Sequence, residues 1–132
     1  MQIPADVKRK IQTRAAQEWP GDYSMQVHVI KEQSEAYLRL TSFSARDHTD
    51  EITTNCLAKA TSDWPTDYYM QLYTFEQQMQ SARAFLEFHD PAVPGYVLEE
   101  VRAMAISEWP GDYEMMLHTL KTQIEAWISI HG

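Results

Sequence analysis

The 132-residue sequence has one cysteine, four glycines and no long apolar run. Because Cys56 is the only cysteine, no internal disulfide can form, which is typical of a protein of the reducing cytoplasm. No uninterrupted apolar segment approaches the roughly 18 residues that span a bilayer, and the segment from Met1 to Gln12 lacks the apolar core of a secretory signal. We therefore expect a cytoplasmic protein with no membrane partner.

Motifs of catalysis and cofactor binding are missing as well. The sequence contains no GxxxxGK[ST], GxGxxG, GxSxG or HExxH segment. His28 and Glu32 stand four residues apart, a spacing that can form one edge of a metal site, but the second of the repeats described below has neither residue. Cys56 falls on an apolar helical stripe and is expected in the core. The sequence predicts no enzyme, and no catalytic residue, cofactor or metal ligand.

Charge is unevenly distributed along the chain, whose formal net charge is −8. Residues 1–46 carry seven Lys/Arg and five Asp/Glu, a balance of +2, whereas residues 47–132 carry four and fourteen, a balance of −10. Lys8, Arg9, Lys10 and Arg14 could contact phosphates, but no interleaved aromatic residues or reading motif accompany them. The balance therefore argues against nucleic acid as a partner.

One segment of the sequence occurs three times. EWPGDYSMQ at 18–26 returns as DWPTDYYMQ at 63–71 and as EWPGDYEMM at 108–116, each time 45 residues further on. When the chain is written in three rows of this length, seven columns are identical in all rows. They include the predicted structural corner, WPxDY, whose residues are Trp19, Asp22, Tyr23, Trp64, Asp67, Tyr68, Trp109, Asp112 and Tyr113. Such a period indicates a repeated supersecondary unit.

Each repeat predicts two helices joined at the WPxDY corner. Val7, Ile11 and Ala15 recur every four residues before the first corner, which predicts a helix of about 14 residues with Pro20 at its end. Pro4 and Pro94 suit the first turn of such a helix, and Thr49 or Asp50 suits the N-cap of the second one. Longer helices are expected at about 22–43, 67–88 and 112–130, each with two apolar faces. One face should pack within its own hairpin and the other on a neighbouring repeat.

Two columns predict specific contacts at or near the corner. The aspartate should satisfy free N–H groups of the long helix, either as its N-cap or one turn inside, while the tryptophan and tyrosine bury the corner. Gln33, Gln78 and Gln123 lie within an otherwise apolar face. A buried amide needs partners, so we expect a hydrogen bond to backbone at a corner or helix end, with a substrate contact as the alternative.

The sequence therefore predicts a single all-α domain, residues 1–132, with six helices and at least about 70% helix. Its three tandem αα-hairpin repeats cover about 1–45, 46–90 and 91–132. They are expected to form a short solenoid-like stack or, alternatively, a compact bundle with pseudo-threefold symmetry.

This architecture predicts a non-catalytic helical-repeat module that interacts with another protein. The alternatives are an acidic regulator or inhibitor that occupies a basic nucleic-acid site on a partner protein, and a helical protein that binds a small ligand. The candidate interaction face consists of polar-arc positions that vary between rows and that stacking would align, with Tyr73 as the expected anchor. Its residues are His28, Tyr73, His118, Glu35, Gln80 and Glu125.

Overall fold

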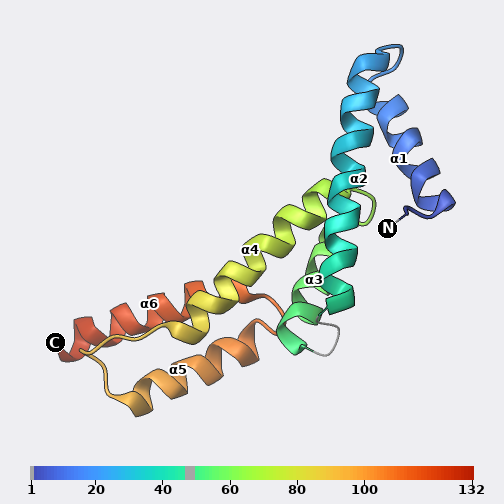
Figure 1. Cartoon of the computed structure of the whole chain (residues 1–132). Helices are drawn as coiled ribbons and strands as arrows, with labels where there is room; N and C mark the ends of the chain where they lie inside the picture. Colours follow the sequence, from blue (N-terminus) through green and yellow to red (C-terminus); the bar gives the residue numbers. More distant parts are fainter. Residues whose placement is uncertain (1, 47–49) are drawn as a thin grey trace. The chain divides into compact units, whose positions relative to one another are not determined.

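The computed structural model of the chain describes residues 2–46 and 50–132, and these residues are 81% helical with no strand (Figure 1). The prediction of an all-α fold with at least about 70% helix is confirmed. The described helices are α1 (Ala5–Glu18), α2 (Tyr23–Arg46), α3 (Glu51–Asp63), α4 (Tyr68–Glu87), α5 (Gly95–Glu108) and α6 (Tyr113–His131). Short and long helices alternate as the three rows of the sequence predict.

The short helix ends in the same way at each of the three corners. The N–H of Trp19, Trp64 or Trp109 donates at 3.0 Å to the carbonyl of the alanine four residues earlier, and the chain then leaves the helix because a proline follows. Gly21 and Gly111 have φ of +76° and +78°. Thr66 occupies the same column without a positive φ, so the backbone of the second corner differs from that of the other two at this residue.

The corner aspartate is the N-cap of each long helix. Its Oδ1 accepts the N–H of the third helical residue, at 3.1 Å for Asp22 and Asp67 and at 3.2 Å for Asp112. This geometry decides between the two positions that the sequence left open. Asp50 caps α3 in a similar way by accepting the N–H of Ile52 at 3.0 Å, while Thr49 lies outside the described residues.

The predicted stripe of the short helices forms the core. Ile11, Ala15, Cys56 and Ala60 are almost completely buried, whereas Ile52 and Val101 of the same stripe are only half-buried. Burial, assisted by the charge of Asp50, raises the pKa of the Cys56 thiol to about 12. The thiol therefore stays protonated at neutral pH and acts as an apolar core group.

The corner tryptophans are less buried than the sequence predicts. Trp19 is 41% exposed and Trp64 is 38% exposed, so the expectation of a buried indole is wrong for these two corners. Polar contacts orient two of the indoles, because the N–H of Trp64 donates to Thr74 Oγ1, and that of Trp109 to Thr119 Oγ1, each at 3.0 Å. The indole is thus fixed by its polar edge while part of the ring stays in water.

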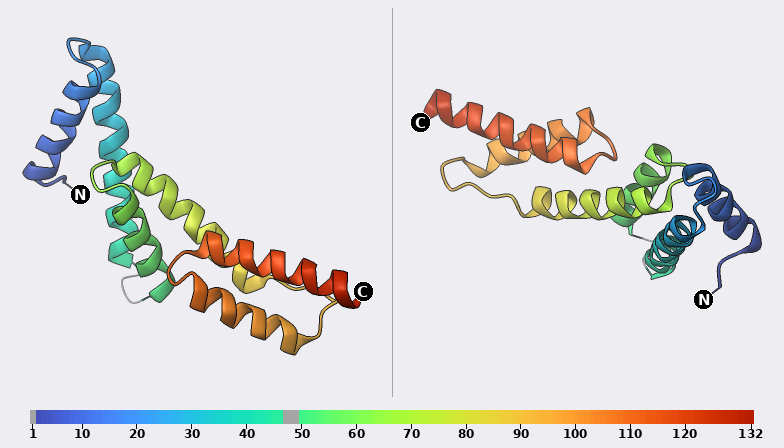
Figure 2. Two further views of the ribbon diagram at one scale, coloured as in Figure 1. Left: turned by 180° about the vertical axis from the view of Figure 1, so that it is seen from behind. Right: turned by 90° about the horizontal axis from the view of Figure 1, so that it is seen from above.

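The described residues form two compact units, Met1–Phe75 and Glu76–Gly132, with the boundary inside α4. In the first unit α2 runs antiparallel to α1 and to α3, which lie beside different parts of its length (Figures 1 and 2). In the second unit α5 and α6 form an antiparallel pair. Arg102 of α5 also donates to the carbonyls of Leu86 and Phe88 at the end of α4. The single domain, and the choice between a stack and a bundle, stay predictions.

Candidate interaction surfaces

The invariant glutamine of one repeat binds the corner of the next repeat. Gln33 Nε2 donates to Asp67 Oδ1 at 2.8 Å, and Gln33 Oε1 accepts the N–H of Tyr68 at 2.8 Å. Gln78 makes the same two contacts, at 3.2 Å to Asp112 Oδ1 and at 2.8 Å from the Tyr113 N–H. We call this Gln–Asp–Tyr arrangement the repeat junction. The prediction that the glutamine binds backbone at a corner is confirmed for Gln33 and Gln78.

The repeat junction satisfies N–H groups that a helix start leaves without an intrahelical partner. Within the second and third corners the aspartate accepts the N–H of the third helical residue, and the glutamine from the preceding repeat accepts the N–H of the first, a tyrosine. The side-chain N–H₂ of the glutamine donates to the same aspartate, because a carboxylate can accept several hydrogen bonds. A corner in this arrangement therefore needs a preceding helix that supplies an amide side chain at the right place.

Arg14 reinforces the first repeat junction from the side of α1. Its Nη2 lies 3.0 Å from Asp67 Oδ2 and 3.1 Å from Glu18 Oε1, and its Nη1 is 3.5 Å from the carbonyl oxygen and the hydroxyl of Thr66. Lys59 and Met104 occupy its column in the other two rows. The arginine bridge is thus a property of the first row of the repeat.

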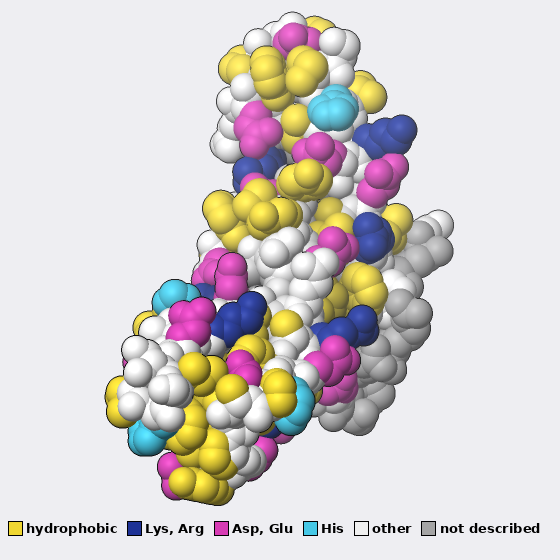
Figure 3. Space-filling model, turned by 90° about the vertical axis from the view of Figure 1, so that its left-hand side faces the viewer, with side chains coloured by type: hydrophobic (Ala, Val, Ile, Leu, Met, Phe, Trp, Pro, Cys, Tyr) yellow, Lys and Arg dark blue, Asp and Glu magenta, His cyan; other side chains and the backbone are white. Residues whose placement is uncertain are grey.

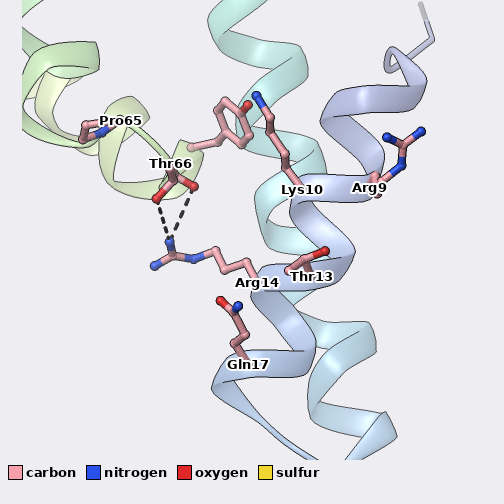
Figure 4. A pocket seen from close by; sticks show the side chains of 8 residues that line it. Arg9, Lys10, Thr13, Arg14, Gln17, Pro65 and Thr66 are labelled. Atoms are coloured by element: carbon pink, nitrogen blue, oxygen red, sulfur yellow. Dashed lines mark hydrogen bonds between the residues drawn. The ribbon is translucent and has the colours of Figure 1, made fainter.

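A pocket of about 350 Å³ lies between α1 and the second corner (Figure 4). Its lining residues are Arg9, Lys10, Thr13, Arg14, Gln17, Pro65, Thr66 and Tyr68. Arg14 reaches across to Thr66, whereas Arg9 and Lys10 are exposed and have no acidic partner within the described part of the chain. Burial raises the pKa of Tyr68, and the nearby Tyr37 and Asp6 add to this, so its phenol stays neutral. Two cations without an ion-pair partner among the described residues and a neutral phenol suit an anionic ligand, while the nearby Asp6 carboxylate lowers the positive charge of the pocket.

The six residues of the candidate interaction face are all exposed, but they do not form one row. Tyr37 packs edge-on against Tyr68 with ring centroids 5.2 Å apart, and Phe43 lies 4.9 Å from Phe75. Contacting positions on α2 and α4 are therefore about 31 to 35 residues apart, rather than the 45 of the repeat. Equivalent positions are displaced by ten or more residues, at least about 15 Å along a helix.

The expected alignment of His28 with Tyr73 is therefore wrong. The contact between Gln78 and Tyr113 in the second unit has the same separation of 35 residues, so the displacement recurs there. The residues of the candidate interaction face therefore stay predictions as individual partner contacts, but they do not share one row. They are His28, Tyr73, His118, Glu35, Gln80 and Glu125.

The described residues offer little that could hold a metal. His28 Nε2 lies 3.6 Å from Glu32 Oε2 on the exposed side of α2, as their spacing predicts. Within residues 2–46 and 50–132, no group of three or more His, Cys, Asp or Glu side chains is arranged to bind a metal ion. In the same residues no helix is long and apolar enough to cross a membrane.

Hydrophobic side chains are exposed at several places on the surface. On the face in Figure 3 they lie among acidic, basic and histidine side chains. Tyr69, Tyr73 and Tyr96 are among the exposed aromatic residues.

No protein-family model, no curated protein and no solved structure matches this chain.

Proposed function

We propose that the protein is a non-catalytic helical-repeat module that binds another protein, and that the pocket beside α1 receives an acidic segment of this partner. The observation that carries the proposal is the unequal pairing of the three cations in the pocket. Arg14 is neutralised by Asp67 and Glu18, whereas Arg9 and Lys10 have no acidic partner among the described residues. An exposed pair of cations beside a preformed hollow favours a ligand that brings carboxylates.

The chemistry of the pocket favours a protein segment over a nucleic acid. Nucleic-acid binding draws on many phosphate contacts along an extended basic surface, and this chain carries a net charge of −8. The pocket instead offers two cations next to the apolar surface of Pro65 and the ring of Tyr68. A glutamate side chain fits this combination, because its methylene groups can contact the apolar part while its carboxylate meets a guanidinium.

The exposed long-helix residues form the second surface that we propose for the partner. Tyr73 is 54% exposed on α4, and a tyrosine offers apolar area with a polar tip. We propose it as the anchor of that contact.

A titration of the isotope-labelled protein with an acetylated decapeptide of alternating glutamate and glycine tests the pocket. We expect amide shift changes confined to residues 9–17 and 65–68 in nuclear magnetic resonance spectra at low salt. The double variant Arg9→Ala/Lys10→Ala should weaken binding by about tenfold, because it removes both cations that have no ion-pair partner.

The matched control is Lys31→Ala/Lys121→Ala, which removes two exposed cations on α2 and α6 and leaves the pocket intact. It should change the affinity by less than about twofold. Equal weakening in both double variants would mean that only net charge matters. Tighter binding of a ten-nucleotide oligothymidylate than of the peptide would replace the protein partner by a nucleic acid.

A further inference from the structure

The first corner is more exposed to solvent than the other two corners. Tyr113 is 9% exposed and Tyr68 is half-buried against Tyr37, but Tyr23 in the same column is 75% exposed. Val27, one turn further along α2, is 65% exposed, whereas its column equivalents Leu72 and Leu117 are half-buried. The face that docks on a preceding repeat is thus open to solvent in the first repeat.

The last long helix shows the opposite half of the same arrangement. Gln33 and Gln78 are buried in repeat junctions, but Gln123 is exposed and binds no corner within the described residues. Ile130 is 76% exposed, while Leu40 and Phe85 in its column are buried. α6 therefore presents to solvent an amide and an apolar side chain from columns that α2 and α4 keep buried.

These two open faces are chemically complementary. Asp22 and Tyr23 form a capped corner whose first helical N–H can still donate to a partner, and Gln123 has the amide that such a corner binds. Trp127, in the column of Tyr37, lies one helical turn after Gln123 on α6, where its half-buried ring stacks on His131 with ring centroids 4.3 Å apart. Residues 1–45 carry six Lys/Arg and five Asp/Glu, whereas residues 91–132 carry two Lys/Arg and six Asp/Glu. The first and third repeats therefore also differ in charge.

We propose that the α6 face of one copy binds the first corner of a second copy, head to tail, through the repeat junction that the chain already uses twice. Gln123 Nε2 would donate to Asp22 Oδ1 of the second copy, and its Oε1 would accept the Tyr23 N–H. Lys8 stands in the column of the buried Thr53 and Leu98, so it would bring a positive charge to the acidic third repeat. Such a heterologous contact can add further copies at either end. This inference does not depend on the pocket beside α1.

Sedimentation velocity tests the self-association over a concentration series from about 5 µM to about 500 µM, a range suited to a weak contact. The average mass of the unmodified protein should rise with concentration above the 15.4 kDa of one chain. Gln123→Ala and Tyr23→Ala should each weaken the association by about tenfold. A matched substitution of an exposed tyrosine outside the proposed contact, Tyr96→Ala, should leave it unchanged.

Mixing the two interface variants distinguishes a head-to-tail contact from a two-fold contact. The Gln123→Ala chain keeps its first corner and the Tyr23→Ala chain keeps its α6 face, so an equimolar mixture should form a 1:1 dimer and stop there. Circular dichroism should show the same helix content in both variants, because both side chains are exposed. The proposal is overturned if the unmodified protein keeps the monomer mass throughout, if Gln123→Ala associates like the unmodified protein, or if the mixture stays monomeric.

Discussion

Gln78→Ala should lower the free energy of unfolding by about 2 to 4 kcal/mol, whereas Gln123→Ala should change it by less than about 0.5 kcal/mol. Gln78 is 2% exposed and connects Asp112 to the N–H of Tyr113. Its truncation leaves a buried N–H without an acceptor and a cavity where the amide was. Gln123 occupies the same column on α6 but is exposed.

Urea unfolding followed by circular dichroism measures both values. The protein concentration should be at the low end of the range given above, so that self-association does not contribute to the stability. Because the substitution and the helical position are the same, Gln123→Ala controls for helix propensity and for the loss of the side chain itself. Similar losses for both variants would show that the repeat junction contributes nothing beyond these local effects.

Asp67→Ala should cost about 2 to 4 kcal/mol of unfolding free energy, and Asp22→Ala only about 1 kcal/mol. Both aspartates cap a long helix, but Asp67 also accepts the Gln33 amide and pairs with Arg14. Its removal leaves the buried amide of Gln33 without its acceptor. The same urea titration gives the difference between the two variants.

Asp67→Asn provides a further control for this prediction. The asparagine oxygen can still cap α4 and accept from Gln33, so most of the stability should return and only the ion pair with Arg14 is lost. Equal costs for Asp67→Ala and Asp22→Ala would show that capping alone explains the invariant aspartate column.

The helices, their order and the position of each corner could be predicted from the sequence. The stripe of Ile11 and Ala15 fixes the face of a short helix, and the proline fixes its end, because both effects act within a few residues. The role of the glutamine column was also predictable in kind, because a buried amide requires a hydrogen-bond partner. The corner that each glutamine reaches was not predictable from its own row.

The displacement between neighbouring repeats could not be read from the period. A spacing of 45 residues gives the length of the unit, but the separation of 35 residues between Gln33 and Tyr68 depends on how two helices cross. For this reason the predicted alignment of His28 with Tyr73 was wrong. The pocket beside α1 was missed for the same reason, because Arg9 and Lys10 line it together with Thr66 from the next repeat.

The polar anchor of two corner tryptophans had a signal in the sequence. Trp64 and Trp109 are each followed ten residues later by a threonine that accepts the indole N–H, whereas Val29 occupies this position in the first row. A polar partner at a fixed distance indicates an indole that is oriented by its N–H, but the partner does not set how much of the ring is exposed.

Amide hydrogen exchange at the three corner tyrosines tests most directly whether the repeat junction joins one repeat to the next. The Gln123→Ala variant is suited to this measurement, since its α6 face can no longer supply the amide for Tyr23 of a second copy. The first N–H of a helix normally exchanges fast because it has no intrahelical partner. The N–H groups of Tyr68 and Tyr113 should exchange at least about tenfold more slowly than that of Tyr23, because Gln33 and Gln78 accept them. Equal, fast exchange at all three tyrosines would contradict the repeat junction.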